Sequence, residues 1–111
     1  MLPTQTLFNR AYKLWLRRPG TPYWVEGEGL RRRTIEEIWA KYLPDLPASD
    51  YAALTARFRE IDRRAYELGL RFINEEPMDE PGSETLLREF PELAPERARA
   101  AYAKGTRIAA F

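Results

Sequence analysis

The chain has 111 residues, a length that indicates one domain able to bury a core of its own. It contains no cysteine and no histidine, which excludes disulfide scaffolds, thiolate metal sites and catalysis by a Cys nucleophile or a His base. The net charge is +1, but residues 1–33 hold seven basic and two acidic side chains, whereas residues 75–111 hold five basic and eight acidic ones, so a polarised molecule is expected.

The first predicted element is a helix from about residue 4 to residue 18. Thr4 is suited to cap its N-terminus, and Pro19 and Gly20 are expected to end it. Its apolar residues have helical spacing and are Leu7, Ala11, Leu14 and Trp15.

A small β-hairpin is expected next, near residues 23–32. Residues 23–25 have strand character, Gly27-Glu28 suits a two-residue turn, and the following residues return as a second strand. The Gly27-Glu28-Gly29 stretch lacks the lysine and the third glycine of phosphate-binding loops, so it is interpreted as a plain turn.

A short helix and a long helix follow the hairpin. Thr34 and Glu37 form a capping box that begins the short helix, and the LPDLP stretch of residues 43–47 ends it. The long helix is expected from about residue 49 to 74 and carries an apolar heptad seam of Tyr51, Leu54, Phe58, Ile61, Ala65, Leu68 and Phe72. Either the chain's own helices cover this seam, or a second copy covers part of it in a homodimer through the Tyr51–Phe72 seam.

The opposite face of the long helix alternates in charge and is expected to face water. Its members are Arg57, Glu60, Arg64, Glu67 and Arg71. Residues 74–83 then form an acidic, proline-containing connector, whose carboxylates lack the spacing of a calcium loop.

A pair of short helices is predicted over residues 83–104. Ser83 is expected to cap the first, Pro95 to begin the second, and Gly105 to follow its end. The segments IEEIWAKYLPDLPASDYAAL and SETLLREFPELAPERARAAY share a helix, Pro-acidic-Leu, helix pattern when one gap is allowed, which fits either a duplication or a common way to turn a corner. The whole chain, residues 1–111, is therefore predicted to be one mainly α domain, a compact bundle of four or five helices with a small hairpin.

Two surfaces are candidates for binding. The first, for a protein partner, consists of the hairpin aromatics and the adjacent arginines: Tyr23, Trp24, Arg31, Arg32 and Arg33. The arginines either form a patch or pair with neighbouring glutamates. The second, for nucleic acid, draws on the basic N-terminal third and on the C-terminal helix pair, and consists of Arg17, Arg18, Arg97, Arg99 and Lys104.

The segment SETLLREFPELAPERARAAYA, residues 83–103, resembles the helix-turn-helix segment of the small VapB-like antitoxin families. An acidic aliphatic helix, an aromatic-Pro-acidic-Leu turn and an alanine-rich second helix carry the resemblance. It implies DNA binding through Arg97, Arg99 and Lys104, usually as a dimer.

The function expected from these patterns is binding without catalysis. No pair of Asp or Glu residues stands in a distinctive apolar setting, and no cofactor or metal site is expected. No apolar run approaches the roughly 20 residues of a membrane span, so a cytoplasmic protein is expected. We expect a small regulatory protein, an adaptor or inhibitor of the phage or plasmid accessory kind, that binds a protein partner; the alternative is a helix-turn-helix DNA-binding regulator.

Overall fold

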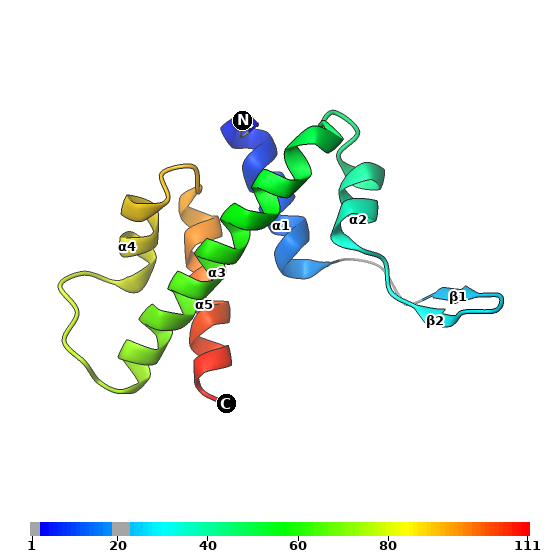
Figure 1. Ribbon diagram of the computed structural model, residues 1–111. Coiled ribbons are helices and arrows are strands. Elements are labelled where there is room, and N and C mark those ends of the chain that lie inside the picture. Colours follow the sequence, from blue (N-terminus) through cyan, green and yellow to red (C-terminus); the bar gives the residue numbers. More distant parts are fainter. Residues whose placement is uncertain (1–2, 19–22) are drawn as a thin grey trace.

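In chain order, the described residues form one helix, a two-stranded hairpin and four further helices (Figure 1). The structure is a computed structural model that describes residues 3–18 and 23–111, with the backbone alone for Tyr23. The elements are α1 (Gln5–Arg17), β1 (Tyr23–Val25), β2 (Gly29–Arg31), α2 (Ile35–Tyr42), the 3₁₀ turn η1 (Ala48–Asp50), α3 (Tyr51–Ile73), α4 (Gly82–Glu89) and α5 (Pro95–Ala109). The prediction of a mainly α fold is confirmed. Pro19 and Gly20, which were predicted to end the first helix, lie outside the described residues.

Side-chain caps begin two of the helices as the sequence predicts. Thr4 Oγ1 accepts a hydrogen bond from the backbone N–H of Leu7 at 3.4 Å, and Thr34 Oγ1 accepts one from that of Glu37 at 3.2 Å. The expectation that Ser83 caps α4 is wrong, because the helix already begins at Gly82 and its side chains provide no capping bond.

The long helix α3 runs through the helical body, and the other helices pack around it (Figure 1). Its seam is buried from Leu54 to Leu68, each seam residue being at most 1% exposed. Phe58 lies at the centre of an aromatic cluster, with ring centroids 4.8 Å from Tyr12 and 5.7 Å from Trp15. This chain's own helices therefore cover the seam, which leaves no room there for the predicted homodimer contact; only the end residue Phe72 is well exposed.

Helices α3 and α5 meet backbone to backbone at two glycines. A Cβ on Gly105 would lie 2.5 Å from the carbonyl oxygen of Ala65, and a Cβ on Gly69 would lie 2.7 Å from the backbone nitrogen of Thr106. The prediction that α5 ends before Gly105 is wrong, since this glycine provides the close approach inside the helix rather than a C-terminal cap.

The two Pro-acidic-Leu corners have the same backbone conformation. The helix ends at Leu43, with φ −128° and ψ 68°, and at Phe90, with φ −126° and ψ 76°. In each corner the N–H of the following leucine, Leu46 or Leu93, donates to that residue's carbonyl at 3.0 Å. All four side chains are buried, so the corner presents two apolar anchors to the core and joins α2 to η1 and α3, and α4 to α5.

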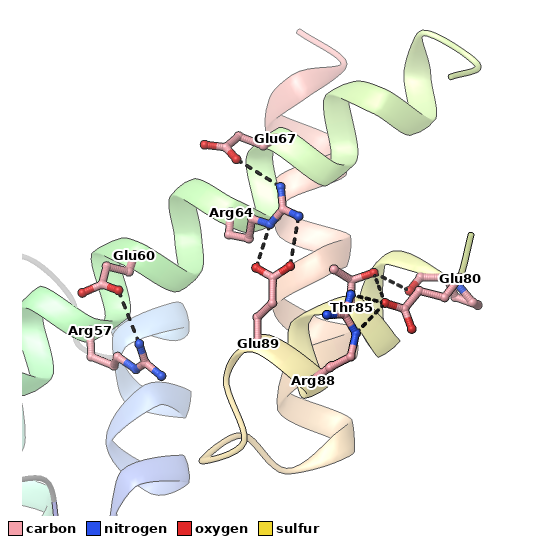
Figure 2. Close-up of polar contacts among 9 residues, drawn as sticks. Arg57, Glu60, Arg64, Glu67, Glu80, Thr85, Arg88 and Glu89 are labelled. Atoms are coloured by element: carbon pink, nitrogen blue, oxygen red, sulfur yellow. Dashed lines mark hydrogen bonds and ion pairs between the residues drawn. The ribbon is translucent and has the colours of Figure 1, made fainter. Parts of the chain in front are cut away.

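Two arginines of α3 hold α4 and its following corner in place. Arg57 donates to both carboxylate oxygens of Glu92, at 2.6 and 2.9 Å. Arg64 donates to both carboxylate oxygens of Glu89, at 2.9 and 3.0 Å, as Figure 2 shows. The prediction that this face of α3 simply faces water is therefore wrong for Arg57 and Arg64. The bidentate hydrogen bonds raise the pKa of both guanidinium groups and lower the pKa of Glu92.

Candidate functional site

The hairpin is closed by a three-residue loop and not by the two-residue turn that the sequence suggested. Val25 pairs with Gly29, so the loop consists of residues 26–28, and the N–H of Glu28 donates to the carbonyl of Val25 at 3.0 Å. Gly27 and Gly29 have φ of 82° and 83°, conformations that side-chain-bearing residues rarely adopt. The two glycines therefore serve the turn, as predicted.

The hairpin exposes an apolar pair. Trp24 and Leu30 are directly opposite in the antiparallel register, which places their side chains on the same face of the hairpin. Trp24 is 74% exposed and Leu30 is 69% exposed. The hairpin projects from the helical body (Figure 1), so this face has open surroundings. We call Trp24, Leu30 and the exposed Arg32, which follows Leu30 by two residues, the hairpin face.

The three arginines divide into different roles. The Arg31 guanidinium lies 3.6 Å from the carboxylate of Glu28 and 3.6 Å from that of Glu37, so it links the hairpin to the start of α2. The pairing of Arg31 with Glu28 agrees with the second of the two predicted possibilities, in which the arginines pair with neighbouring glutamates. Arg32 and Arg33 are exposed, and the side chain of Tyr23 lies outside the described residues.

A second surface forms where α1 meets α5, two helices that carry residues predicted to bind nucleic acid. Arg10 and Lys13 of α1 and Arg97 of α5 line one hollow of ≈ 520 Å³, together with Asn9, Glu96 and their neighbours. Arg17 is exposed one helical turn beyond Lys13 and extends the row of basic side chains along α1. We call Arg10, Lys13, Arg17 and Arg97 the basic groove.

Asn9 and Asp62 fix the two helices that form the basic groove. The Asn9 side chain accepts from the N–H of Ala94 at 2.7 Å and donates to the carbonyl of Glu92 at 2.8 Å, so it attaches α1 to the corner before α5. Asp62 of α3 accepts from the Tyr12 hydroxyl and from Trp15 Nε1, both at 2.8 Å. Burial, and then the Asp62 charge, raises the pKa of Tyr12 far above its usual value.

The remaining predicted nucleic-acid residues do not join into one face. The Lys104 amine lies 3.7 Å from Asp62, and the Arg18 guanidinium lies 4.8 Å from the centre of the Trp15 ring, so both charges already have local partners. Arg99 is two residues from Arg97, which is about 200° around the helix, so it points away from the basic groove. One side of α5, including Ala98, Ala101 and Gly105, is buried.

Comparisons with protein-family models, with curated proteins and with solved structures found no match. The resemblance of residues 83–103 to VapB-like antitoxins therefore stays a prediction. In the described part of the chain, no group of three or more carboxylates is arranged to hold a metal ion. No helix of the described residues is long and apolar enough to cross a membrane.

The sites predicted from the sequence did not include Leu30 of the hairpin face. They also did not include Arg10 and Lys13 of the basic groove. Leu30 had a detectable signal, because any hairpin centred on Gly27 places it across from Trp24 or one residue away. Arg10 and Lys13 share a face of α1, but their proximity to Arg97 depends on the packing of helices far apart in the chain.

Proposed function

We propose that this protein is a small, non-catalytic interaction protein that binds a protein partner through the hairpin face, as an adaptor or an inhibitor. The single observation that supports the proposal most is the cross-strand pair of Trp24 and Leu30, both more than two-thirds exposed. A tryptophan is among the side chains most enriched in interface hot spots, and arginine, here Arg32, is another.

The exposed tryptophan has enough surface to anchor a partner. A tryptophan buries roughly 200 Å² when it is fully enclosed. At about 25 cal/mol per Å², enclosing the exposed 74% of Trp24 would contribute on the order of 3–4 kcal/mol before ordering costs. Since a two-stranded hairpin is only marginally stable by itself, ordering the hairpin on binding is one of the costs set against this contribution.

The absence of cysteine and histidine supports a function without catalysis, and the absence of cysteine also suits the reducing cytoplasm, where we propose the protein acts. The carboxylates Glu89 and Glu92, which would otherwise be free to act as acids or bases, are held by arginines. Their role is therefore to fix α4 and its corner against α3.

Capture from a lysate of the source organism tests the hairpin face. Wild-type protein, Trp24→Ala and the control Tyr42→Ala would be immobilised in parallel; Tyr42 is also exposed but lies on α2. We expect one or more proteins to bind the wild type and the control and to be lost with Trp24→Ala, while Trp24→Ala melts within about 2 °C of the wild type. Equal capture by all three proteins, or a large loss of stability in Trp24→Ala, would contradict the proposal.

A second candidate function is nucleic-acid binding as a DNA-binding regulator, favoured by the basic groove. Arg10, Lys13 and Arg97 make no ion pair within the described residues, and they converge from two helices on one hollow. Three phosphate contacts give a slope of roughly −2.7 for log affinity against log salt, so affinity should fall about 40-fold between 50 and 200 mM salt.

Fluorescence anisotropy with labelled duplex DNA measures this slope directly. We expect the double variant Arg10→Glu with Arg97→Glu to lose binding, and the variant Arg59→Glu to retain most of it, because Arg59 is exposed on α3 and does not line the hollow. If the wild type fails to bind at about 50 mM salt, nucleic acid is excluded as the partner of the basic groove.

A further inference from the structure

The end of the molecule away from the hairpin carries a second exposed apolar region. The connector between α3 and α4 lies at the opposite end of the molecule from the hairpin (Figure 1). There Phe72, Met78 and Tyr102 line a hollow of ≈ 410 Å³, and Phe72 and Met78 also line an adjoining hollow of ≈ 580 Å³. Phe72 is 61% exposed although it belongs to the apolar seam of α3. We call the two hollows the connector cleft.

Local backbone and side-chain features position the connector that borders the cleft. The chain reverses direction after α3 at Glu75, which has a φ of 56°, a conformation that is uncommon for residues other than glycine. Glu80 accepts hydrogen bonds from the Thr85 hydroxyl at 3.0 Å and from Arg88 at 2.6 Å, which fastens the connector to α4 (Figure 2). The Tyr102 ring lies directly over Gly82, where a Cβ would collide with it.

The rim of the connector cleft is acidic. Glu75 and Glu76 line one hollow and Asp79 lines the other. None of these three carboxylates makes an ion pair within the described residues, and the only connector carboxylate that does is Glu80, with Arg88. An apolar cleft bordered by unpaired carboxylates is complementary to a ligand that presents apolar side chains next to a cation.

The hairpin face of the same chain has that chemistry. Trp24 and Leu30 are apolar and exposed. Arg32, two residues after Leu30, is exposed and makes no ion pair within the described residues. The charge distribution along the chain agrees with this pairing. Residues 1–33, which include the hairpin face, are predominantly basic, and residues 75–111 are predominantly acidic. Because the hairpin and the connector lie at opposite ends of a molecule 52 Å long, the hairpin does not reach its own cleft.

We propose that the hairpin face of one copy docks in the connector cleft of a second copy, so that the protein associates with itself head to tail. This inference rests on the proposed function of the hairpin as a protein-binding element and names its partner. Two different surfaces meet in such a contact, so each added copy presents a new free hairpin and a new free cleft. The assembly therefore grows with concentration or closes into a ring, and high salt weakens it.

Sedimentation velocity over protein concentrations from about 5 to about 500 µM tests the association. We expect the average mass of the wild type to rise with concentration and to fall again when salt is added. Trp24→Ala and Phe72→Ala should each weaken the association by about 30-fold, the effect of a typical hot-spot truncation. Ile108→Ala is the control, because Ile108 is 52% exposed but lines neither hollow, and it should behave as the wild type.

Mixing the two defective variants distinguishes head-to-tail association from any symmetric dimer. Trp24→Ala retains an intact cleft and Phe72→Ala retains an intact hairpin face, so an equimolar mixture should form a pair that cannot extend. Its mass should be about 26 kDa, twice the 13.0 kDa of the chain. Phe72→Ala truncates a side chain of α3, so a second test uses the charge-reversed variants Arg32→Glu and Glu76→Arg. Each of these variants alone should lose self-association, and their mixture should regain it.

The outcomes separate the two proposals. A wild type that stays monomeric at the highest concentration, or a mixture that stays monomeric while both variants are folded, overturns self-association but leaves the capture experiment to decide the function of the hairpin. Association that survives Trp24→Ala overturns self-association through the hairpin, and it likewise leaves the capture experiment to decide the function of the hairpin.

Discussion

The crossing of α3 and α5 predicts that adding one methyl group in the middle of a helix destabilises this protein. In an ordinary helix, replacing glycine by alanine stabilises by about 1 kcal/mol, because alanine has the higher helix propensity. In Gly105→Ala, however, the new Cβ would lie 2.5 Å from the carbonyl carbon and oxygen of Ala65 and 2.8 Å from the backbone nitrogen of Tyr66. These are backbone atoms, so no side-chain rotation relieves the contact.

The expected net change in the free energy of unfolding is the difference between the gain in helix propensity and the cost of the backbone overlap. Overpacking costs typically 1–3 kcal/mol, and a backbone contact belongs near the upper end of that range, so we expect a net loss of about 2 kcal/mol. At the usual unfolding entropy per residue, a chain of 111 residues would melt about 9 °C lower. The assay is urea unfolding followed by far-UV circular dichroism, together with a thermal melt.

The control for Gly105→Ala is Ala103→Gly, at an exposed position of the same helix, which should cost about 1 kcal/mol from helix propensity alone. The sign of the Gly105→Ala effect is decisive. A variant that is more stable than the wild type would show that the two helices do not approach as closely as the structure has them, and the placement of α5 would be refuted.

Two further predictions concern buried polar contacts. Asp62→Ala leaves the Tyr12 hydroxyl and Trp15 Nε1 without their acceptor, so urea unfolding should show a free energy of unfolding that is lower by about 2–4 kcal/mol. Asp62→Asn keeps one oxygen and should lose less. A loss below about 0.5 kcal/mol for the alanine variant would contradict the contact. The hydrogen bonds from Arg57 lower the pKa of Glu92, so this pair stabilises the fold above the carboxyl's ordinary pKa of 4.5 and loses that contribution as pH falls through the lowered pKa. Glu92→Gln should therefore lose about 1 kcal/mol at about pH 7, and this loss should shrink as the pH falls below 4.5 through the lowered pKa. A loss that stays the same across that acid range would contradict the pairing.

Patterns within a short stretch of sequence predicted the structure of that stretch well. The capping box at Thr34 begins α2, and the heptad spacing from Leu54 to Leu68 marks the buried side of α3. Both predictions rest on residues three or four positions apart, whose relative placement is set by the helix itself. The hairpin was predicted for the same reason, since the turn around Gly27 requires a positive φ.

Contacts between distant parts of the chain were not predictable in this way. Gly105 was interpreted as a helix end because a glycine that ends a helix and a glycine that permits a close helix crossing look the same in one sequence. Arg57 and Arg64 were interpreted as facing water because their partners on α4 and its corner are more than twenty residues away. The meeting of Arg10 with Arg97 in the basic groove likewise depends on how α1 packs beside α5.

Site-specific photocrosslinking in cells of the source organism tests the hairpin face most directly. A photoreactive amino acid would replace Leu30 in one variant and Ala53, which is exposed on α3, in a control. We predict that position 30 gives covalent adducts larger than the 13.0 kDa chain, with a 26 kDa adduct of two copies among them if the protein associates with itself, and that position 53 gives none of these. If position 30 gives no adduct, or the same adducts as position 53, the hairpin face is not a protein-binding surface.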